Sequence, residues 1–353
     1  MSYQQYLHRL LEIGIEKEAS DLHLSVGYPP ILRINTNLVI LEKEKILNSK
    51  DCQELAFCLM KEEKKERFLK DKEIDFAYTF NNKIRCRINS YFARNEINIA
   101  IRFIFQKIKT IEELNLPLIL KKIAEAEQGF VLVTGASSQG KSTTLAALID
   151  QINHSRYEHI ITIEDPIEYI FQPDKCLINQ REVYSDTLSF SRALRSTLRE
   201  DPDVIMVGEM RDLETISTAV TAAETGHLVF ATLHTNSTNQ TIHRIIDIFP
   251  PYQQNQIRAQ LSVSLLAVVS QRLIIGINNK IIPVCEIMFN TPAVANLIRE
   301  NKIHELPVII ETSKEAGMIS FNASLVNLVK KRLITKETAL KYSFNPKDLE
   351  VRL

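Results

Sequence analysis

Residues 130–149 read FVLVTGASSQGKSTTLAALI, and residues 135–142 within them match the pattern G-x-x-x-x-G-K-[ST]. The five residues before the first glycine are apolar or β-branched, as in a buried strand. The residues from Ser142 on contain neither Gly nor Pro, as in a helix. A strand, a glycine-bounded loop and a helix in this order form a phosphate-binding loop, so the sequence predicts a nucleoside triphosphate site.

This loop predicts specific contacts with the nucleotide. The backbone N–H groups of the loop and of the helix start would surround the phosphates. The Lys141 ammonium would reach the β- and γ-phosphates, and the Ser142 hydroxyl would hold Mg²⁺. The expected nucleotide-binding residues are Gly135, Ala136, Ser137, Ser138, Gln139, Gly140, Lys141, Ser142 and Thr143.

Length and composition limit the function classes. A chain of 353 residues predicts two or three domains, and 43 basic against 43 acidic residues give a net charge of zero. Zero net charge argues against a protein whose main task is to bind nucleic acid. The first residues lack a signal peptide, and no run approaches the ~18 apolar residues of a membrane span. Five scattered cysteines without a C-x-x-C pair indicate reduced thiols, so we expect a cytoplasmic protein.

Hydrophobic periodicity divides the chain into an N-terminal domain (1–105), a linker (106–117), a core (118–289) and a helical C-terminal region (290–353). The N-terminal domain is predicted to be mixed α+β. Its expected helices span 1–17 and 51–70, and its expected strands span 21–25, 31–34, 38–41, 83–91 and 96–105. In the last strand Ile97, Ile99 and Ile101 are expected to face inward and Arg102 outward.

The core alternates buried strands with helices, which predicts a parallel sheet with helices on both faces. Its strand candidates are 130–134, 159–163, 204–207 and 228–232. Ligands bind at the carboxyl ends of parallel strands, so Glu209 and Glu164 are expected beside Lys141 as acidic groups. His234 follows the last of these strands and His227 precedes it; both histidines are candidates for contact with the γ-phosphate.

Several stretches resemble a known family. Residues 198–212 (LREDPDVIMVGEMRD) resemble the signature of the type II/IV secretion ATPase superfamily. Residues 223–236 (AETGHLVFATLHTN) resemble its histidine box, and residues 162–169 (TIEDPIEY) its aspartate box. Residues 19–24 followed by two prolines, and residues 293–300 (AVANLIRE), are similar to motifs of the pilus-retraction branch of this superfamily.

The resemblance implies an α/β protein with a PAS-like N-terminal domain and a RecA-like P-loop ATPase domain. It implies a homohexameric ring that binds ATP between subunits and hydrolyses it to drive type IV pilus retraction. It further implies a cytoplasmic position at the inner face of the membrane, beside a platform protein of the pilus base. The implied catalytic residues are Glu209, which also approaches Mg²⁺ through water, together with Glu164, His227 and His234.

The family also places N-terminal arginines against the phosphates, and Arg94 and Arg102 are our candidates for completing a neighbouring subunit's site. Alternatively, these two arginines are ordinary surface charges that pair with acidic residues.

The family's loop usually reads GPTGSGKS, so Ser138 replaces a glycine and is strained if its φ is positive. Ala295 replaces a family arginine. An accessory retraction ATPase, or a subunit that binds ATP with little hydrolysis, remains as an alternative. Extension and secretion ATPases are disfavoured because their tetracysteine motif is absent.

Overall fold

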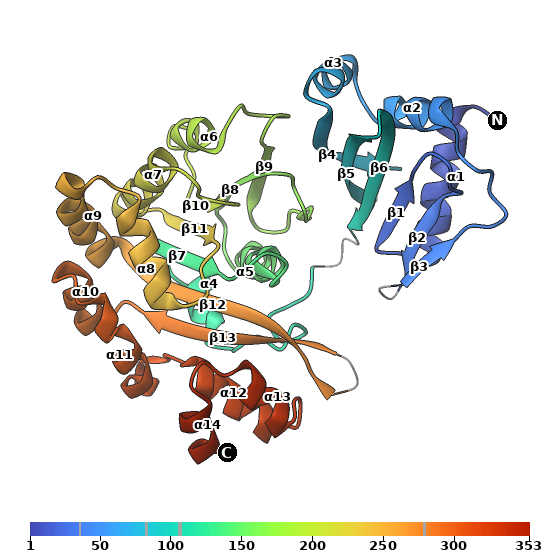
Figure 1. Cartoon of the computed structure of the whole chain (residues 1–353). Helices are drawn as coiled ribbons and strands as arrows, with labels where there is room; N and C mark the ends of the chain where they lie inside the picture. The colour runs from blue at the N-terminus through green and yellow to red at the C-terminus, as the bar shows by residue number, and fades with distance from the viewer. Residues whose placement is uncertain (35–36, 82–83, 105–107, 278–279) are drawn as a thin grey trace. The chain divides into compact units, whose positions relative to one another are not determined.

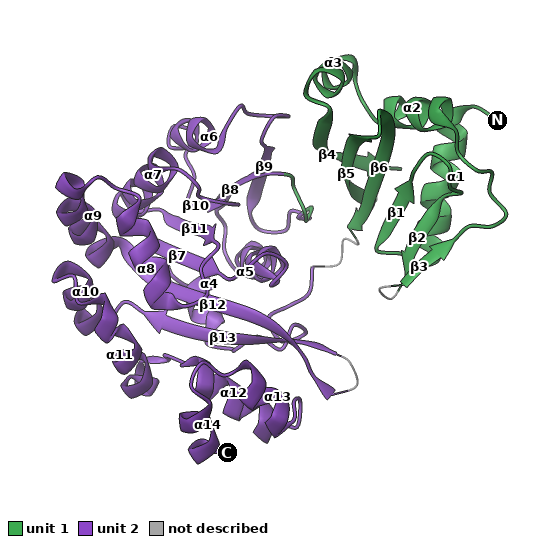
Figure 2. Ribbon diagram, in the orientation of Figure 1, with its two compact units in different colours: residues 1–107, 166–170 green, residues 108–165, 171–353 purple. Residues whose placement is uncertain are grey.

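A computed structural model describes residues 1–34, 37–81, 84–104, 108–277 and 280–353 of the chain. It divides into two compact units, one of residues 1–107 with 166–170 and one of residues 108–165 with 171–353 (Figure 2). The predicted boundary between the N-terminal domain and the linker, at residues 105 and 106, lies outside the described residues. Residues 166–170 group with the first unit although the sequence places them in the core. The domain division drawn from the sequence therefore stays a prediction.

The first unit is an antiparallel sheet of order β3-β2-β1-β6-β5-β4 with three helices (Figure 1). The predicted helix over 51–70 is two helices, because the chain breaks at Leu59–Lys61, where Leu59 and Met60 both enter the core. Strand β4 is additional to the predicted strands. The elements are α1 (Tyr3–Glu16), β1 (Asp21–Leu24), β2 (Ile31–Ile34), β3 (Asn37–Ile40), α2 (Ser49–Cys58), α3 (Glu62–Asp71), β4 (Glu73–Phe80), β5 (Ile84–Ala93) and β6 (Glu96–Ile104).

Alternation along β6 separates the core from the surface of this unit. Ile97, Ile99 and Ile101 are buried and join a cluster that includes Leu10 of α1, whereas Arg102 is exposed, as predicted. Successive side chains of a strand point to opposite faces, so one face of the sheet carries the core and the other carries charge.

The second unit is a sheet of order β13-β12-β7-β11-β10-β8-β9, parallel except for the antiparallel pair β12–β13. The four predicted strands are its adjacent central strands, and β9, β12 and β13 extend it at both sides. The strands are β7 (Gly129–Thr134), β8 (His159–Glu164), β9 (Leu177–Glu182), β10 (Val204–Val207), β11 (Leu228–Leu233), β12 (Leu265–Ile275) and β13 (Ile281–Phe289).

Helices surround this sheet and fill the C-terminal part of the chain, as predicted for the region after 290 (Figure 1). They are α4 (Leu120–Ala124), α5 (Lys141–Ser155), α6 (Phe190–Thr197), α7 (Leu213–Glu224), α8 (Thr238–Asp247), α9 (Pro251–Ser264), α10 (Pro292–Arg299), α11 (Leu306–Thr312), α12 (Phe321–Lys330), α13 (Lys336–Tyr342) and α14 (Pro346–Arg352). Among the described residues, no helix has both the length and the apolar character needed to cross a membrane.

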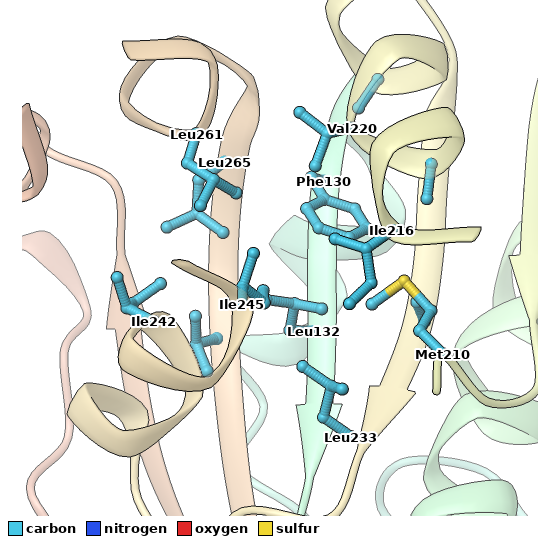
Figure 3. Close-up of a cluster of buried hydrophobic side chains, with 14 of the residues drawn as sticks. Phe130, Leu132, Met210, Ile216, Val220, Leu233, Ile242, Ile245, Leu261 and Leu265 are labelled. Atoms are coloured by element: carbon cyan, nitrogen blue, oxygen red, sulfur yellow. The ribbon is translucent and has the colours of Figure 1, made fainter. Parts of the chain in front are cut away.

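The main core lies between the sheet and helices α6 to α11. Phe130 and Leu132 of β7 are fully buried there against Ile216 of α7 and Ile245 of α8 (Figure 3). Burying each such side chain stabilises the fold by about 1.5–3 kcal/mol. Val131 and Val133, equally buried, alternate with them and therefore point to the opposite face. Apolar residues at every position of β7 thus reflect a strand that is covered on both faces.

The parallel register aligns the strand ends. Thr134 of β7 pairs with Leu233 of β11, Val207 of β10 pairs with Ala231, and Ile163 of β8 pairs with Val207. The residues that follow these strands therefore gather at the carboxyl-terminal ends of the parallel strands, and we call this end of the sheet the loop edge. The residues that precede the strands gather at the opposite edge.

Candidate functional site

The phosphate loop lies between β7 and α5 and is pressed against β12. A Cβ atom on Gly135 would lie 2.4 Å from the Gln271 backbone oxygen, and one on Gly140 would lie 2.9 Å from Gln271 Nε2. Gly140 also has φ +78° and is the residue directly before α5. Contact with the β12 backbone therefore requires glycine at 135, and the positive φ of Gly140 favours glycine at 140.

Ser138 occupies the left-handed region with φ +61°. The family's loop carries glycine at this position, and the structure shows that the position does need a positive φ. A serine there costs about 1–2 kcal/mol relative to an ordinary backbone conformation. The loop of this chain therefore has the turn that the family's glycine forms, with backbone strain at Ser138.

Lys141 begins α5 and is turned into the loop. Its Nζ donates to the Gly135 and Ala136 backbone oxygens, at 2.9 Å each, and the residue is only 9% exposed. No side chain in the described chain caps the start of α5, so this helix start presents backbone N–H groups to a ligand. Ser142 is exposed and Thr143 half-buried on the first turn, while Ala136, Ser137 and Ser138 are exposed on the loop.

A chain of polar contacts joins Lys141 to the acidic residue that follows β10. Lys141 Nζ lies 3.5 Å from Nδ1 of His234, and His234 Nε2 lies 3.1 Å from Oε1 of Glu209. Arg211 forms a bidentate ion pair with the same carboxylate: its Nε lies 2.8 Å from Oε1 and its Nη2 2.8 Å from Oε2 of Glu209. This network assigns the proton of a neutral His234 ring to Nε2, because Nδ1 accepts from the lysine. The predicted meeting of Lys141, Glu209 and His234 is thus present.

Hydrogen bonds between threonine hydroxyl groups connect the loop that contains His234 to strand β7. The neighbouring residue Thr235 has its Oγ1 2.7 Å from that of Thr241 in α8. Thr241 in turn donates to Thr134 Oγ1, at 3.3 Å, at the end of β7. These contacts tie the residue that follows His234 to the end of β7 through α8.

The Glu209 carboxyl has a pKa below its ordinary range. Burial acts to raise this pKa, but the hydrogen bonds and charge of Arg211 lower it, and the electrostatic effect of His234 and the charge of Lys141 add to the lowering. Glu209 is therefore a carboxylate at neutral pH, which is the form that can accept a hydrogen bond from water.

Glu164 ends β8 at the same edge and is 7% exposed. Its Oε1 accepts from Thr162 Oγ1 at 2.6 Å and from Gln180 Nε2 at 3.1 Å. Gly208, directly before Glu209, packs so closely that a Cβ atom there would lie 3.4 Å from the Glu164 Cα. The two predicted acidic residues thus lie on adjacent backbones.

The structure places His227 away from the phosphate loop of its own chain. Its backbone oxygen accepts from Gly129 N, at the start of β7, whereas the phosphate loop follows the end of that strand. Its ring is held locally, with Nδ1 2.9 Å from the Ala222 oxygen. A six-residue strand, β11, separates His227 from His234. Because a strand rises about 3.3 Å per residue, His227 cannot contact phosphates in the loop of its own chain.

The two candidate arginines belong to the first unit. Arg102 is 65% exposed along its side chain, and its Nε lies 2.9 Å from Asp21 Oδ1 on the neighbouring strand β1. Arg94 is exposed at the turn between β5 and β6, with φ +53°. Arg102 therefore has an acidic partner within its own unit, which the sequence pattern of its segment did not indicate.

The sequence reasoning missed two residues of the site. Arg211 follows Glu209 by two positions inside the motif already singled out, so its charge was a usable signal. Gln271 is 2% exposed beneath the loop, where its Oε1 accepts from Thr144 Oγ1 at 2.7 Å. Its strand was not predicted, although a polar Ser-Gln-Arg triplet inside the apolar run 265–275 marks an exceptional position.

The strand order, the phosphate loop and the charged groups of the loop edge define a RecA-like P-loop domain. The chain belongs to the family of type II/IV secretion system proteins, whose family model matches residues 2–325.

The chain is 45% identical to the type IV pilus retractation ATPase PilT of Pseudomonas aeruginosa over 94% of its length and 96% of that protein. It is 41% identical to the type IV pilus ATPase PilU of the same organism, over 98% of its length and 90% of that protein. The crystal structure of the pilus retraction motor PilT with bound ADP superposes with a TM-score of 0.91 at 43% identity, covering 98% of both chains.

Proposed function

We propose that this protein hydrolyses ATP to ADP and phosphate and uses the reaction to retract type IV pili. The observation that carries the proposal is the contact chain from Lys141 through His234 to Glu209 at the phosphate loop. The likeness to PilT along nearly the whole of both chains supports the same function. An accessory role of the PilU kind has less support, since the identity is 41% against 45%.

Each residue of the loop edge has a defined task in this proposal. The loop backbone and the start of α5 bind the phosphates, and Lys141 exchanges its two carbonyl partners for phosphate oxygens. The Glu209 carboxylate accepts a hydrogen bond from the attacking water and orients it toward the γ-phosphorus. Donation from Nε2 of His234 and from Arg211 keeps that carboxylate ionised and in place.

The residues also fit a magnesium ion. The Ser142 hydroxyl is exposed on the first turn of α5, and hydroxyl and carboxylate oxygens are ligands that this ion accepts. Ser142 would bind Mg²⁺ directly and Glu209 through water, while Glu164 provides a second acid. When bound, the ion neutralises charge that develops on the phosphate oxygens.

Assembly into a homohexamer would complete the site. Arg94 and Arg102 of one subunit are proposed to approach the phosphates held by the next, where a permanent guanidinium charge stabilises the transition state. Arg102 would then leave Asp21 or share it, because one guanidinium carries donors for both partners. The ring is proposed to act in the cytoplasm at the inner membrane face, against a platform protein of the pilus base, and without nucleic acid.

A phosphate-release assay with MgATP tests the proposal. We expect turnover that needs Mg²⁺, is lost in Lys141→Ala, and disappears when dilution dissociates the ring. Arg102→Ala or Arg94→Ala should lower turnover more than nucleotide affinity, and mixing either with Lys141→Ala should restore part of it. Wild-type protein that binds ATP without turnover would identify a nucleotide-gated subunit instead. Failure to restore twitching to a host that lacks its PilT would refute the retraction role.

A further inference from the structure

Strand β12 runs past the end of its parallel neighbour. β7 ends at Thr134, which pairs with Ser270, whereas β12 continues to Ile275. On its other side β12 stays paired with β13, and Leu273 lies opposite Pro283. Beyond Ser270, the strand order of the described residues therefore leaves one edge of β12 without a neighbouring strand. A backbone N–H on this edge needs another acceptor.

Gln139 of the phosphate loop supplies that acceptor. Its Oε1 accepts from the backbone N of Leu273 at 2.6 Å. Its own backbone oxygen accepts from Gln271 Nε2 at 2.8 Å. Gln271 is also bound through Oε1 to Thr144 of α5, so its buried amide is satisfied at both ends. Side chain and backbone of Gln139 are thus both held by β12.

The residues on either side of Leu273 contact the C-terminal helices. Ile274 is buried in a cluster with Phe321 and Leu325 of α12. Arg272 lies over the Phe344 ring with its Cζ 4.2 Å from the ring centroid, and over Phe321 at 5.6 Å. A displacement of the Leu273 backbone therefore acts on α12 through packed neighbours on both sides.

We propose that Gln139 is a positioning residue that transmits the nucleotide state of the phosphate loop to the β12–β13 hairpin and the C-terminal helices. The proposal rests on the proposed function, because it takes nucleotide phosphate as the ligand of the loop. Phosphate binding redirects the Lys141 ammonium, whose contacts here are with the Gly135 and Ala136 oxygens and with His234 Nδ1, and the loop that carries Gln139 adjusts with it. The serine usual at this position in the family ends two bonds closer to the backbone and cannot make the Leu273 contact.

Residue-resolved amide hydrogen exchange, with ADP and Mg²⁺ as the ligand, tests the link. Gln139→Met keeps the length of the side chain and removes its acceptor, and Gln139→Ser introduces the family residue. Gln151→Met makes the same exchange on α5 and serves as the control. The ADP affinity of each variant is measured first, and every exchange experiment uses ADP at a concentration that saturates that variant, so a change in affinity does not enter the comparison. Without nucleotide, the Leu273 amide should exchange about 10-fold faster in both variants.

The decisive measurement is the effect of ADP on exchange in α12. Wild type and Gln151→Met should show an ADP-dependent change in residues 321–330, and both Gln139 variants should lose it while the loop still responds. An unchanged response of α12 in the Gln139 variants, or its absence in wild type, would overturn the link. Loss of ADP binding by the wild-type protein would instead refute the proposed function, so the two failures are distinguishable.

Discussion

The two edges of the parallel sheet carry similar residues and differ in what they can bind. The loop edge joins Lys141, His234 and Glu209 in one contact chain. The opposite edge has a cavity of about 650 Å³ lined by His227, Arg156, Glu158 and other residues. There Arg156 forms an ion pair with Glu158 and donates to the Ala124 backbone oxygen at 3.0 Å. The positive charge of Arg156 is therefore balanced by an acidic residue of the same chain.

Helix direction explains the difference. α5 begins at the loop edge, with N–H groups that favour anions, and ends at the opposite edge beside Arg156. α7 also ends at that edge, beside Gly226 and His227. Helix C-termini carry partial negative charge, and Glu125 and Glu127 of the cavity add to it. The loop edge of the chain therefore favours anions more than the opposite edge does.

The largest expected effect comes from breaking the loop edge itself. Lys141→Ala should abolish turnover and weaken nucleotide binding, because it removes the charge beside the β- and γ-phosphates. Glu209→Gln should keep binding and lose turnover by about 10²–10³-fold, or about 3–4 kcal/mol of transition-state stabilisation. Phosphate release and ADP titration measure the two effects. Normal turnover of the Gln variant would transfer the catalytic role to Glu164.

Matched histidine variants compare the two edges directly. His234→Ala should lower turnover by about 10-fold or more, since the imidazole joins Lys141 to Glu209. His227→Ala should stay within about 2-fold, because His227 lies at the opposite edge from the phosphate loop of its own chain. Both are measured by phosphate release at saturating ATP. Equal losses in the two variants would mean that the opposite edge also takes part in hydrolysis.

Two carboxyl groups, Glu209 at the loop edge and Glu286 within β13, should respond to pH with opposite signs. The Glu209 pKa is lowered in the fold, so its stabilisation is present above its ordinary pKa and is lost as pH falls through the lowered value. Burial raises the pKa of Glu286, which accepts from Thr238 N and Oγ1, so its ionisation costs stability as pH rises.

Urea unfolding between pH 3 and 8 measures this contrast through the Gln variants. Relative to wild type, Glu209→Gln should become less stable as pH rises, because wild type gains the stabilisation of the ionised carboxylate. Glu286→Gln should become more stable relative to wild type over the same range. The same sign for both variants would contradict the environments described.

The smallest expected effect separates two serines of the phosphate loop. Ser138→Gly should stabilise the protein by about 0.5 kcal/mol, because relief of the left-handed strain exceeds the entropy cost of glycine. Ser137 is not among the residues with positive φ, so Ser137→Gly relieves no strain. It should destabilise the protein by about 0.5–1 kcal/mol because glycine loses more backbone entropy on folding. Denaturant unfolding without nucleotide distinguishes them. A destabilising Ser138→Gly would show that the turn does not store strain.

Local sequence patterns predict the phosphate loop, the four central strands, and the placement of Lys141, Glu209, Glu164 and His234 where strands end or helix α5 begins. These features depend on local patterns: buried β-branched runs, a glycine-bounded loop, and polar residues that directly follow strands. Parallel strands in register then bring those residues together without further information.

Contacts between segments that are distant in sequence become visible in the folded chain alone. His227 lies within the same motif as His234, and only its place before β11 sends it to the opposite edge. Asp21 meets Arg102 across strands that are 81 residues apart in sequence. Gln139 meets Leu273 because β12 runs beyond β7, which depends on the lengths of two distant strands. Such contacts are set by register and packing, and a local pattern contains neither.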